Sequence, residues 1–350
     1  MNHKENFLRT VRFEKPEYIP MAFYINHACW NNYNQEALKD LMESHPFLFP
    51  DYKRPAGKVV PEYLLNARAG NPYTDPWKCV WETTEDGITG SVHGHPLETW
   101  DNFDSYKALA AEETDGTYPV DWKKLAEAAE LAKKENTLFS CGLPHGHTFL
   151  RLQDIRGYEN LLFDMYDETP NLVRLMEMVE EFNFAYISKL LELNPDMISY
   201  PEDLGMQNGP MISPELFKRF IKPSYTRLMK PAREKGCIVH MHSDGDIRVL
   251  VDDLIDGGVE VINLQDLVNG IDWIAEKFSG KICVDLDLDR QSVTRFGSPK
   301  DIDALILEEV REIGTPQGGL LMKYGLYPGV PLENAKAVMD AMEKYAFFYR

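Results

Sequence analysis

Three features that would assign the chain to a common protein class are missing from the sequence. Positive charge is scarce, because 37 lysines and arginines stand against 56 aspartates and glutamates, a net charge of −19. A chain this acidic repels nucleic acid and anionic membrane surfaces, so we expect neither as a partner. No apolar run reaches membrane-spanning length, and the first twenty residues lack the apolar core of a signal peptide. We therefore expect a cytoplasmic protein that acts on a small molecule.

Paired cysteines and a glycine-rich phosphate loop are also missing. The five cysteines are an odd number, lie far apart and include no Cys-x-x-Cys pair, which argues against a disulfide framework. No Gly-x-Gly-x-x-Gly follows the first strand-like runs, which weakens a dinucleotide-binding interpretation. What is present is a chain of 350 residues with 44% apolar residues, enough for a sizeable globular core.

Short apolar runs alternate with amphipathic helical stretches along the chain. Seven runs have the length and the Val, Ile, Leu and aromatic content of buried parallel strands: 18–27, 136–146, 196–203, 236–245, 259–266, 280–289 and 318–325. This repetition predicts an α/β fold, a (β/α)8 barrel, formed as a single domain over residues 1–350. We expect the segment from about 51 to 120 to be an insertion with a hairpin around Asp86 and Gly87.

Polar residues gather where the predicted strands end. In a (β/α)8 barrel, the carboxyl ends of the strands carry the chemistry. Those ends, unlike the beginnings, hold side chains that bind metals or move protons: His145, His147, Glu202, Asp203, His240, His242, Gln265, Asp266, Asp285, Asp287, Asp289, Lys323 and Tyr324. This asymmetry predicts an enzyme.

A metal site is predicted around the sequence His240-Met241-His242. Residues i and i+2 of a strand point to the same face, so the two imidazoles stand side by side. With Glu202 as a third ligand, they would leave the fourth position of a zinc ion open, as catalysis requires. Iron, cobalt or nickel accept the same ligands. Three other carboxylates could replace Glu202: Asp203, Asp266 and Asp287. The alternative is that the histidines only form hydrogen bonds at the barrel mouth.

A set of motifs follows in a fixed order through the second half of the chain. Asp-Leu-Gly at 203–205 precedes Ser-Pro-Glu-Leu-Phe at 213–217, then the strand end at His240, and Pro-Leu-Glu-Asn at 331–334 opens the last helical stretch. This order resembles the uroporphyrinogen decarboxylase superfamily, and most closely its corrinoid-dependent methyltransferases. The resemblance implies a (β/α)8 barrel, a zinc ion held by His-x-Cys and a later cysteine, and a corrinoid carried by a partner protein. It also implies a homodimer.

The sequence departs from the methyltransferase pattern at the metal ligands. His240 matches the histidine of the motif, but His242 stands where cysteine is expected, and no cysteine lies near Leu326, the place of the second one. Nitrogen and oxygen ligands suit a metal that acts as a Lewis acid on an oxygen. We therefore expect transfer of a methyl group between a small, oxygen-methylated substrate and the corrinoid, that is, an O-demethylation.

Roles for further residues follow from the resemblance. Tyr324 or Lys323 would donate a proton or a hydrogen bond to the leaving oxygen, and Asp287 and Asp203 are further candidates for catalysis. The residues expected to contact the corrinoid lie at the end of the strand at 259–266: Asn263, Gln265 and Asp266.

Two other functions stay open. Decarboxylation of a porphyrinogen is disfavoured for two reasons. The resemblance implies that the decarboxylases bind their acidic tetrapyrrole with an arginine-rich N-terminal stretch, and residues 23–34, at the comparable place, contain no arginine. An acid-rich barrel mouth also repels such a substrate. A decarboxylase or other lyase that acts on a small organic acid without a corrinoid is the main alternative. A binding protein that has lost the chemistry is the third.

Overall fold

The computed structural model describes all 350 residues and groups them into two compact units. Unit 1 comprises residues 1–71, 83–90 and 263–350, and unit 2 comprises residues 72–82 and 91–262. Each unit is built on parallel strands that alternate with helices along the chain, as the sequence predicts. None of the helices combines the length and the apolar character needed to cross a bilayer.

Unit 1 contains a parallel sheet whose strands are hydrogen-bonded in the order β1 (Met21–Ile25), β12 (Leu320–Leu326), β11 (Cys283–Asp287) and β10 (Val261–Gln265). Strand β10 begins in unit 2 and ends in unit 1. Along β12 the side chains alternate, so that Met322, Tyr324 and Leu326 are buried while Lys323 and Gly325 are partly exposed. The charged side chains of β12 and β11 therefore lie on the other face of the sheet from Met322, Tyr324 and Leu326.

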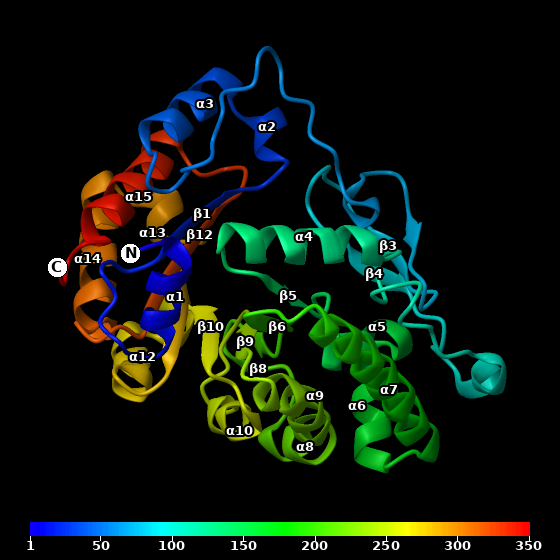
Figure 1. Cartoon of the computed structure of the whole chain (residues 1–350). Coiled ribbons are helices and arrows are strands. Elements are labelled where there is room, and N and C mark those ends of the chain that lie inside the picture. The colour runs from blue at the N-terminus through cyan, green and yellow to red at the C-terminus, as the bar shows by residue number, and fades with distance from the viewer. The chain divides into compact units, whose positions relative to one another are not determined.

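Helices connect the strands of unit 1: α1 (His3–Val11), α2 (Cys29–Asn32), α3 (Gln35–Ser44), η1 (Leu65–Ala67), α11 (Asp266–Asn269), α12 (Ile271–Phe278), α13 (Val293–Phe296), α14 (Pro299–Ile313) and α15 (Leu332–Tyr345). Helix α14 begins with a capping box between Ser298 and Asp301 and has Pro299 in its first turn, which favours a helix start at this point. Helices α14 and α15 pack side by side (Figure 1).

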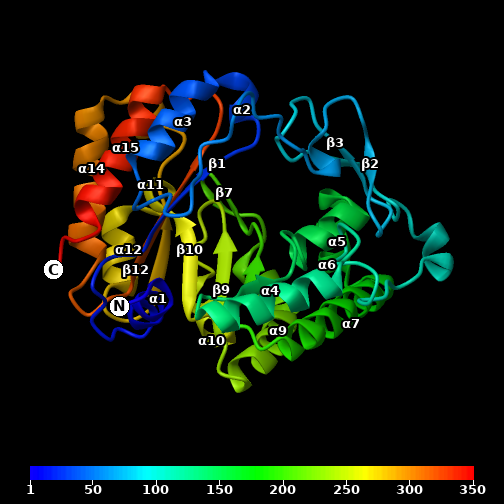
Figure 2. The same cartoon turned by 45° about the horizontal axis from the view of Figure 1, so that its top comes forward.

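Unit 2 contains a second set of parallel strands, in the order β9 (Ile238–Ser243), β6 (Met197–Pro201) and β5 (Ser140–Gly142). The register aligns Ser199 with His240 and Pro201 with His242. The helices before, between and after these strands are α4 (Trp122–Glu135), α5 (Phe149–Arg156), α6 (Tyr158–Asp167), α7 (Pro170–Glu192), α8 (Pro214–Leu216), the π-helical turn η3 (Phe217–Ile221), α9 (Lys222–Glu234) and α10 (Val251–Gly257). Helix α9 packs between α7 and α10 (Figure 2).

A small antiparallel sheet precedes α4 and consists of β2 (Tyr73–Thr74), β3 (Val80–Glu82) and β4 (Ser91–Gly94), with the 3₁₀ turn η2 (Trp100–Ser105) after it. Buried side chains attach this sheet to the rest of unit 2. Asp75 accepts a hydrogen bond of 2.7 Å from the guanidinium of Arg151 on α5, and both side chains are shielded from solvent. Trp77 packs edge-on against Phe182 of α7, with ring centroids 5.3 Å apart. These contacts fix the small sheet to α5 and α7.

Candidate metal centre

Three side chains of unit 2 converge where its parallel strands end. His145 follows β5, Asp203 follows β6, and His242 lies near the end of β9, and their ligand atoms are all within 4.8 Å of one another. Nε2 of His145 lies 3.3 Å from Oδ1 of Asp203, and Nε2 of His242 lies 3.5 Å from the same oxygen. Oδ1 of Asp244 lies 3.8 Å from His242 Nε2. The carboxyl ends of neighbouring parallel strands thus supply two imidazoles and two carboxylates.

The spacing of the three side chains fits a four-coordinate metal ion. Imidazole and carboxylate ligands lie about 2.0–2.2 Å from zinc, and a tetrahedral arrangement at that distance places ligand atoms roughly 3.3 Å apart. The separations of 3.3 and 3.5 Å from Oδ1 of Asp203 to the two imidazole nitrogens match this value. The side chains of His145, Asp203 and His242 can therefore hold zinc, or another divalent metal that accepts nitrogen and oxygen ligands.

The charges of the centre also suit a cation. Burial works to raise the pKa of Asp203, but its bonds to His145 and His242 outweigh burial and hold this pKa well below its usual range. Burial works to lower the pKa of His145, yet the Asp203 carboxylate leaves it raised. The aspartate is therefore an ionised ligand, and a metal that binds here replaces the proton on the imidazole.

Glu202, the first candidate for the third metal ligand, has another role in the structure. Its side chain is fully buried and points to the start of α5. Its oxygens accept hydrogen bonds of 2.5 to 3.4 Å from the backbone N–H groups and the hydroxyl of four residues: Thr148, Phe149, Leu150 and Tyr225. A carboxylate at a helix N-terminus satisfies free amides and is favoured by the helix dipole. Glu202 therefore anchors the loop that carries His145, and the geometry places Asp203 beside the histidines in its stead.

His240 lies on the same face of β9 as His242, as the i, i+2 spacing predicts. Its cross-strand neighbour is Ser199 of β6, one row further from the strand ends than His242, whose neighbour is Pro201. The side chain of His240 is 8% exposed and does not belong to the converging group. We retain His240 as a predicted ligand only for a metal ion that binds deeper than this group.

His145 is named among the strand-end residues of the sequence analysis, but the sequence did not select it as a metal ligand. It stands in a loop between Pro144 and Gly146, where no strand or helix periodicity indicates the direction of a side chain. His147, two residues later, is fully buried and packs against the rings of Tyr200 and Tyr225. Burial lowers the pKa of His147, which makes it a neutral packing residue. The usable signal was the position of the loop at the end of a predicted parallel strand.

Two loops that carry the carboxylates touch each other backbone to backbone. A Cβ atom added to Gly245 would lie 2.2 Å from the carbonyl carbon of Gly205, and Gly245 has φ +80°. The N–H of Asp244 donates to Oδ1 of Asp203 over 3.0 Å, and the N–H of Leu204 donates to Oγ of Ser243 over 2.9 Å. The backbone contact between Gly205 and Gly245, possible because neither has a side chain, and the hydrogen bond from Asp244 thus fix the position of Asp203.

The residues predicted to act in catalysis from β11 and β12 lie in unit 1. Nζ of Lys323 is 3.6 Å from Oδ2 of Asp285, and the guanidinium of Arg290 donates to Asp287 over 2.9 Å. Lys323 and the two aspartates share one face of the sheet, because they alternate with buried apolar residues.

Tyr324 faces the opposite side of β12 from Lys323. Its ring lies 5.2 Å from that of Phe23, its hydroxyl donates to Oγ1 of Thr294 over 3.1 Å, and burial raises its pKa to about 12. A side chain in this position packs the helix side of the sheet. The geometry therefore does not favour the predicted role of Tyr324 as a proton donor, since neighbouring residues of a strand cannot both face the site.

The residues predicted to contact a corrinoid are mostly buried inside unit 1. Asn263 is fully buried, and its side chain donates to the carbonyl oxygen of Asp285. Asp266 is 1% exposed and accepts the N–H groups of Leu267 and Asp289. Only Gln265 is partly exposed, because the chain turns directly from β10 into α11. The geometry leaves Gln265 as the accessible member of the three.

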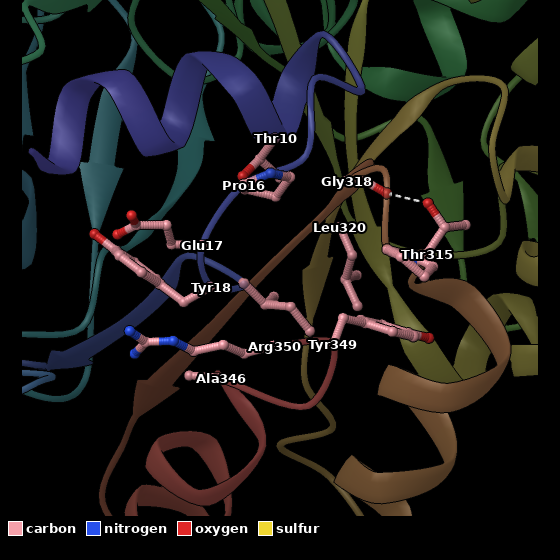
Figure 3. A pocket seen from close by; sticks show the side chains of 12 residues that line it. Thr10, Pro16, Glu17, Tyr18, Thr315, Gly318, Leu320, Ala346, Tyr349 and Arg350 are labelled. Atoms are coloured by element: carbon pink, nitrogen blue, oxygen red, sulfur yellow. Dashed lines mark hydrogen bonds between the residues drawn. The ribbon is translucent and has the colours of Figure 1, made fainter. Parts of the chain in front are cut away.

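A hollow in the surface of unit 1 lies at the other end of its strands (Figure 3). It lies at the beginning of β1 and β12, and the side chains around it include Thr10, Tyr18, Leu320 and Tyr349. The hydroxyl of Thr315 donates to the carbonyl oxygen of Gly318 at its edge. The group of metal ligands at His145, Asp203 and His242 does not include any residue of this hollow.

Comparisons with known proteins give the family. The model of the uroporphyrinogen decarboxylase (URO-D) family matches residues 87–345. Two curated relatives are the methylcobamide:CoM methyltransferase MtaA of Methanosarcina barkeri, 24% identical over 51% of this chain and 50% of its own, and the uroporphyrinogen decarboxylase of Thermus thermophilus, 27% identical over 52% and 51%. The chain thus spans about half the length of the curated relatives it matches.

A solved structure described as a methyltransferase from Methanosarcina mazei has the same fold, with a TM-score of 0.64 over 99% of both chains at 16% identity. This likeness, the family match and the alternation of parallel strands with helices confirm the predicted fold class, an α/β barrel of the uroporphyrinogen decarboxylase type. The chain belongs to the uroporphyrinogen decarboxylase (URO-D) family.

Proposed function

We propose that the protein is a metal-dependent methyltransferase that moves a methyl group from a small, oxygen-methylated substrate to a corrinoid carried by a partner protein. The observation that supports this most directly is the pair of imidazoles, His145 and His242, around one oxygen of Asp203. The relatedness to a methylcobamide:CoM methyltransferase supports methyl transfer with a corrinoid. The nitrogen and oxygen donors support an oxygen, in place of a thiol, as the substrate atom at the metal.

When bound, zinc or a similar ion supplies Lewis acidity to the substrate oxygen. The residues of the chain hold and orient this centre. His145 and His242 contribute neutral nitrogen donors, Asp203 contributes a negative charge, and Glu202 holds the His145 loop at the start of α5. In the balanced reaction, the methyl ether, cob(I)alamin and a proton react to give methylcob(III)alamin and the alcohol. The carbon–oxygen bond breaks, and cobalt provides the electron pair of the new carbon–cobalt bond.

The test combines metal analysis with a methyl-transfer assay. The purified protein is incubated with cob(I)alamin and methoxylated aromatic compounds, and methylcob(III)alamin is followed by its absorption spectrum. We expect one equivalent of a divalent transition metal, activity that a chelator removes and added zinc restores, and loss of activity in His242→Ala. Protein that carries the metal and stays folded, yet forms no methylcobalamin from any of these ethers, contradicts the proposed function.

Relatedness to a uroporphyrinogen decarboxylase gives a second candidate, a lyase or decarboxylase that acts on a small organic acid without a corrinoid. The same preparations separate the two functions. Release of carbon dioxide from carboxyl-labelled aromatic acids in the absence of cobalamin supports decarboxylation, whereas methylcobalamin formation supports methyl transfer.

A further inference from the structure

The charged face of the unit 1 sheet holds a lysine whose hydrogen-bonding capacity is not used. Lys323 lies on β12, which pairs with β1 on one side and with β11 on the other. Its side chain is 24% exposed. Its ion pair with Asp285 spans 3.6 Å, which is too long for a hydrogen bond. An ammonium group has three donors and no acceptor, so Lys323 offers donors to a ligand.

A phenol lies on the same face, on the neighbouring strand. The register pairs Ala22 of β1 with Lys323, and Tyr24 is two residues further along, so its side chain projects to the same side. Removal of the Tyr24 phenol from water and the charge of Asp285 raise its pKa, whereas Lys323 lowers it, as expected for groups that lie near one another. The ring of Tyr24 is largely exposed. Its hydroxyl is therefore a second donor on this face.

A second cation, the guanidinium of Arg290, lies beside Gly325. Gly325 is the register partner of Tyr24, and a Cβ atom at Gly325 would lie 3.3 Å from the ring of Tyr327 and 3.7 Å from a terminal nitrogen of Arg290. The guanidinium of Arg290 lies over the Tyr327 ring at 5.4 Å and donates to Asp287. The position of this cation is therefore set by an ion pair and by an aromatic ring.

The balance of donors and acceptors indicates the charge of a ligand. Asp287 is paired with Arg290, and Asp285 faces Lys323, so each carboxylate already has a cation beside it. The groups with free capacity are donors, the ammonium of Lys323 and the hydroxyl of Tyr24. A carboxylate carries one negative charge and accepts from both. A phosphate dianion would be repelled by the two aspartates, so the face favours a monoanion.

We propose that Lys323 and Tyr24, with Arg290 beside them, form a site on unit 1 that binds the carboxylate of a small organic acid. Lys323 is then a binding residue, and the charge-assisted hydrogen bond from its ammonium holds the carboxylate.

The experiment measures binding without a corrinoid. Titration calorimetry compares the three methoxybenzoate isomers with the matching methoxyphenols, which lack the carboxylate. We expect at least one methoxybenzoate to bind about tenfold or more tightly than its phenol to the wild-type protein, because charge-assisted hydrogen bonds are the stronger ones. In Lys323→Met this preference should vanish, and in Tyr24→Phe it should weaken by about threefold to tenfold. Lys336→Met, which removes a surface ion pair with Asp340 on α15, is the matched control.

Every outcome bears on this site. Equal binding of acid and phenol to the wild type, no acid binding at millimolar concentrations, or an unchanged preference in folded Lys323→Met each overturns it. Lys323→Arg keeps the positive charge and should retain most of the preference. If methyl transfer fails while binding of the acid depends on Lys323, the site stands and the proposed function falls. If transfer proceeds and the preference is absent, the reverse holds.

Discussion

Glu202 and Asp203 are neighbours in the sequence, yet their carboxylates serve different parts of unit 2. Glu202 is fully buried and accepts the first backbone amides of α5, whereas Asp203 lies within 3.5 Å of a nitrogen on each of two imidazoles. Since α5 follows the His145 loop directly, the two carboxylates act on the same centre in different ways. Asp203 contacts the predicted metal position, and Glu202 holds one of its ligands in place.

This division of roles predicts different effects of two matched substitutions. Asp203→Asn removes the anionic ligand, and we expect zinc affinity to fall by more than about 100-fold with little change in melting temperature, because a ligand is lost. Glu202→Gln cannot satisfy the same amides, and we expect a lower melting temperature and a loss of zinc affinity of only about tenfold, since supporting contacts tune a metal site. Competition with a chromogenic chelator measures the affinity. Similar affinities for Asp203→Asn and the wild type would refute the ligand assignment.

His145 gives the second prediction. Removal of its imidazole leaves His242 and Asp203 as two ligands of the converging group, so His145→Ala should bind zinc about 100-fold more weakly. The absorption bands of a cobalt(II)-substituted protein should shift as well, because they depend on the donor atoms. His93→Ala is the control, since His93 is exposed and contacts Ser91 on β4. The assignment is wrong if both variants bind zinc as the wild type does.

Periodicity explains how much of this centre the sequence could reveal. The parallel strands, their order along the chain and the collection of polar residues at their ends follow from apolar runs and turns. Alternation also places His240 and His242 on one face. By the same rule Lys323 and Tyr324, which are adjacent in a strand, point to opposite faces of the sheet. In the structure the ring of Tyr324 packs against the buried ring of Phe23.

Loop residues were beyond the reach of this rule. Residues 202 and 203 follow β6, so no alternation decides which carboxylate meets the histidines, and His145 lies in a loop without period. Their directions depend on tertiary contacts, the amides of α5 for Glu202 and the touching loops at Gly205 and Gly245 for Asp203. Asp266 is buried because β10 passes directly into α11, a tertiary feature that its sequence neighbours do not encode.

Gly245 supplies the third prediction. A methyl group at this position meets the backbone of Gly205 at 2.2 Å, and φ +80° is strained for any residue with a Cβ atom. We expect Gly245→Ala to lower the stability of the fold by about 2 kcal/mol or more, since backbone cannot move aside cheaply. Because the displaced loop carries the N–H donor to Asp203, zinc affinity should fall as well. Gly209→Ala is the control. Gly209 also has a positive φ but open space around its Cβ position, so any larger loss of stability in Gly245→Ala reports the clash with Gly205.

A buried carboxyl pair in unit 1 gives the last prediction. Glu309 of α14 is fully buried near Asp266, and neither of its carboxyl oxygens has a hydrogen-bond partner. Burial raises the pKa of Asp266 to about 6, and burial together with the Asp266 charge raises that of Glu309 well above its usual value. The folded protein therefore keeps protons on this pair in a pH range where the unfolded chain has released them.

The sign of the pH dependence follows from that difference. Between about pH 4.5 and the raised pKa values, the folded state binds more protons than the unfolded state, so this pair lowers the free energy of unfolding as pH rises. The side chain of Glu309→Gln stays neutral at every pH, so this variant should lose much less of its free energy of unfolding as pH rises. We expect the stability of the variant relative to the wild type to rise from pH 5 to pH 8, by about 1.4 kcal/mol for each pKa unit by which folding raises the pKa of this pair. Urea unfolding at several pH values measures the gain, with the exposed Glu308→Gln as control. A gain that is the same at pH 5 and pH 8 would show that the pair holds no extra proton.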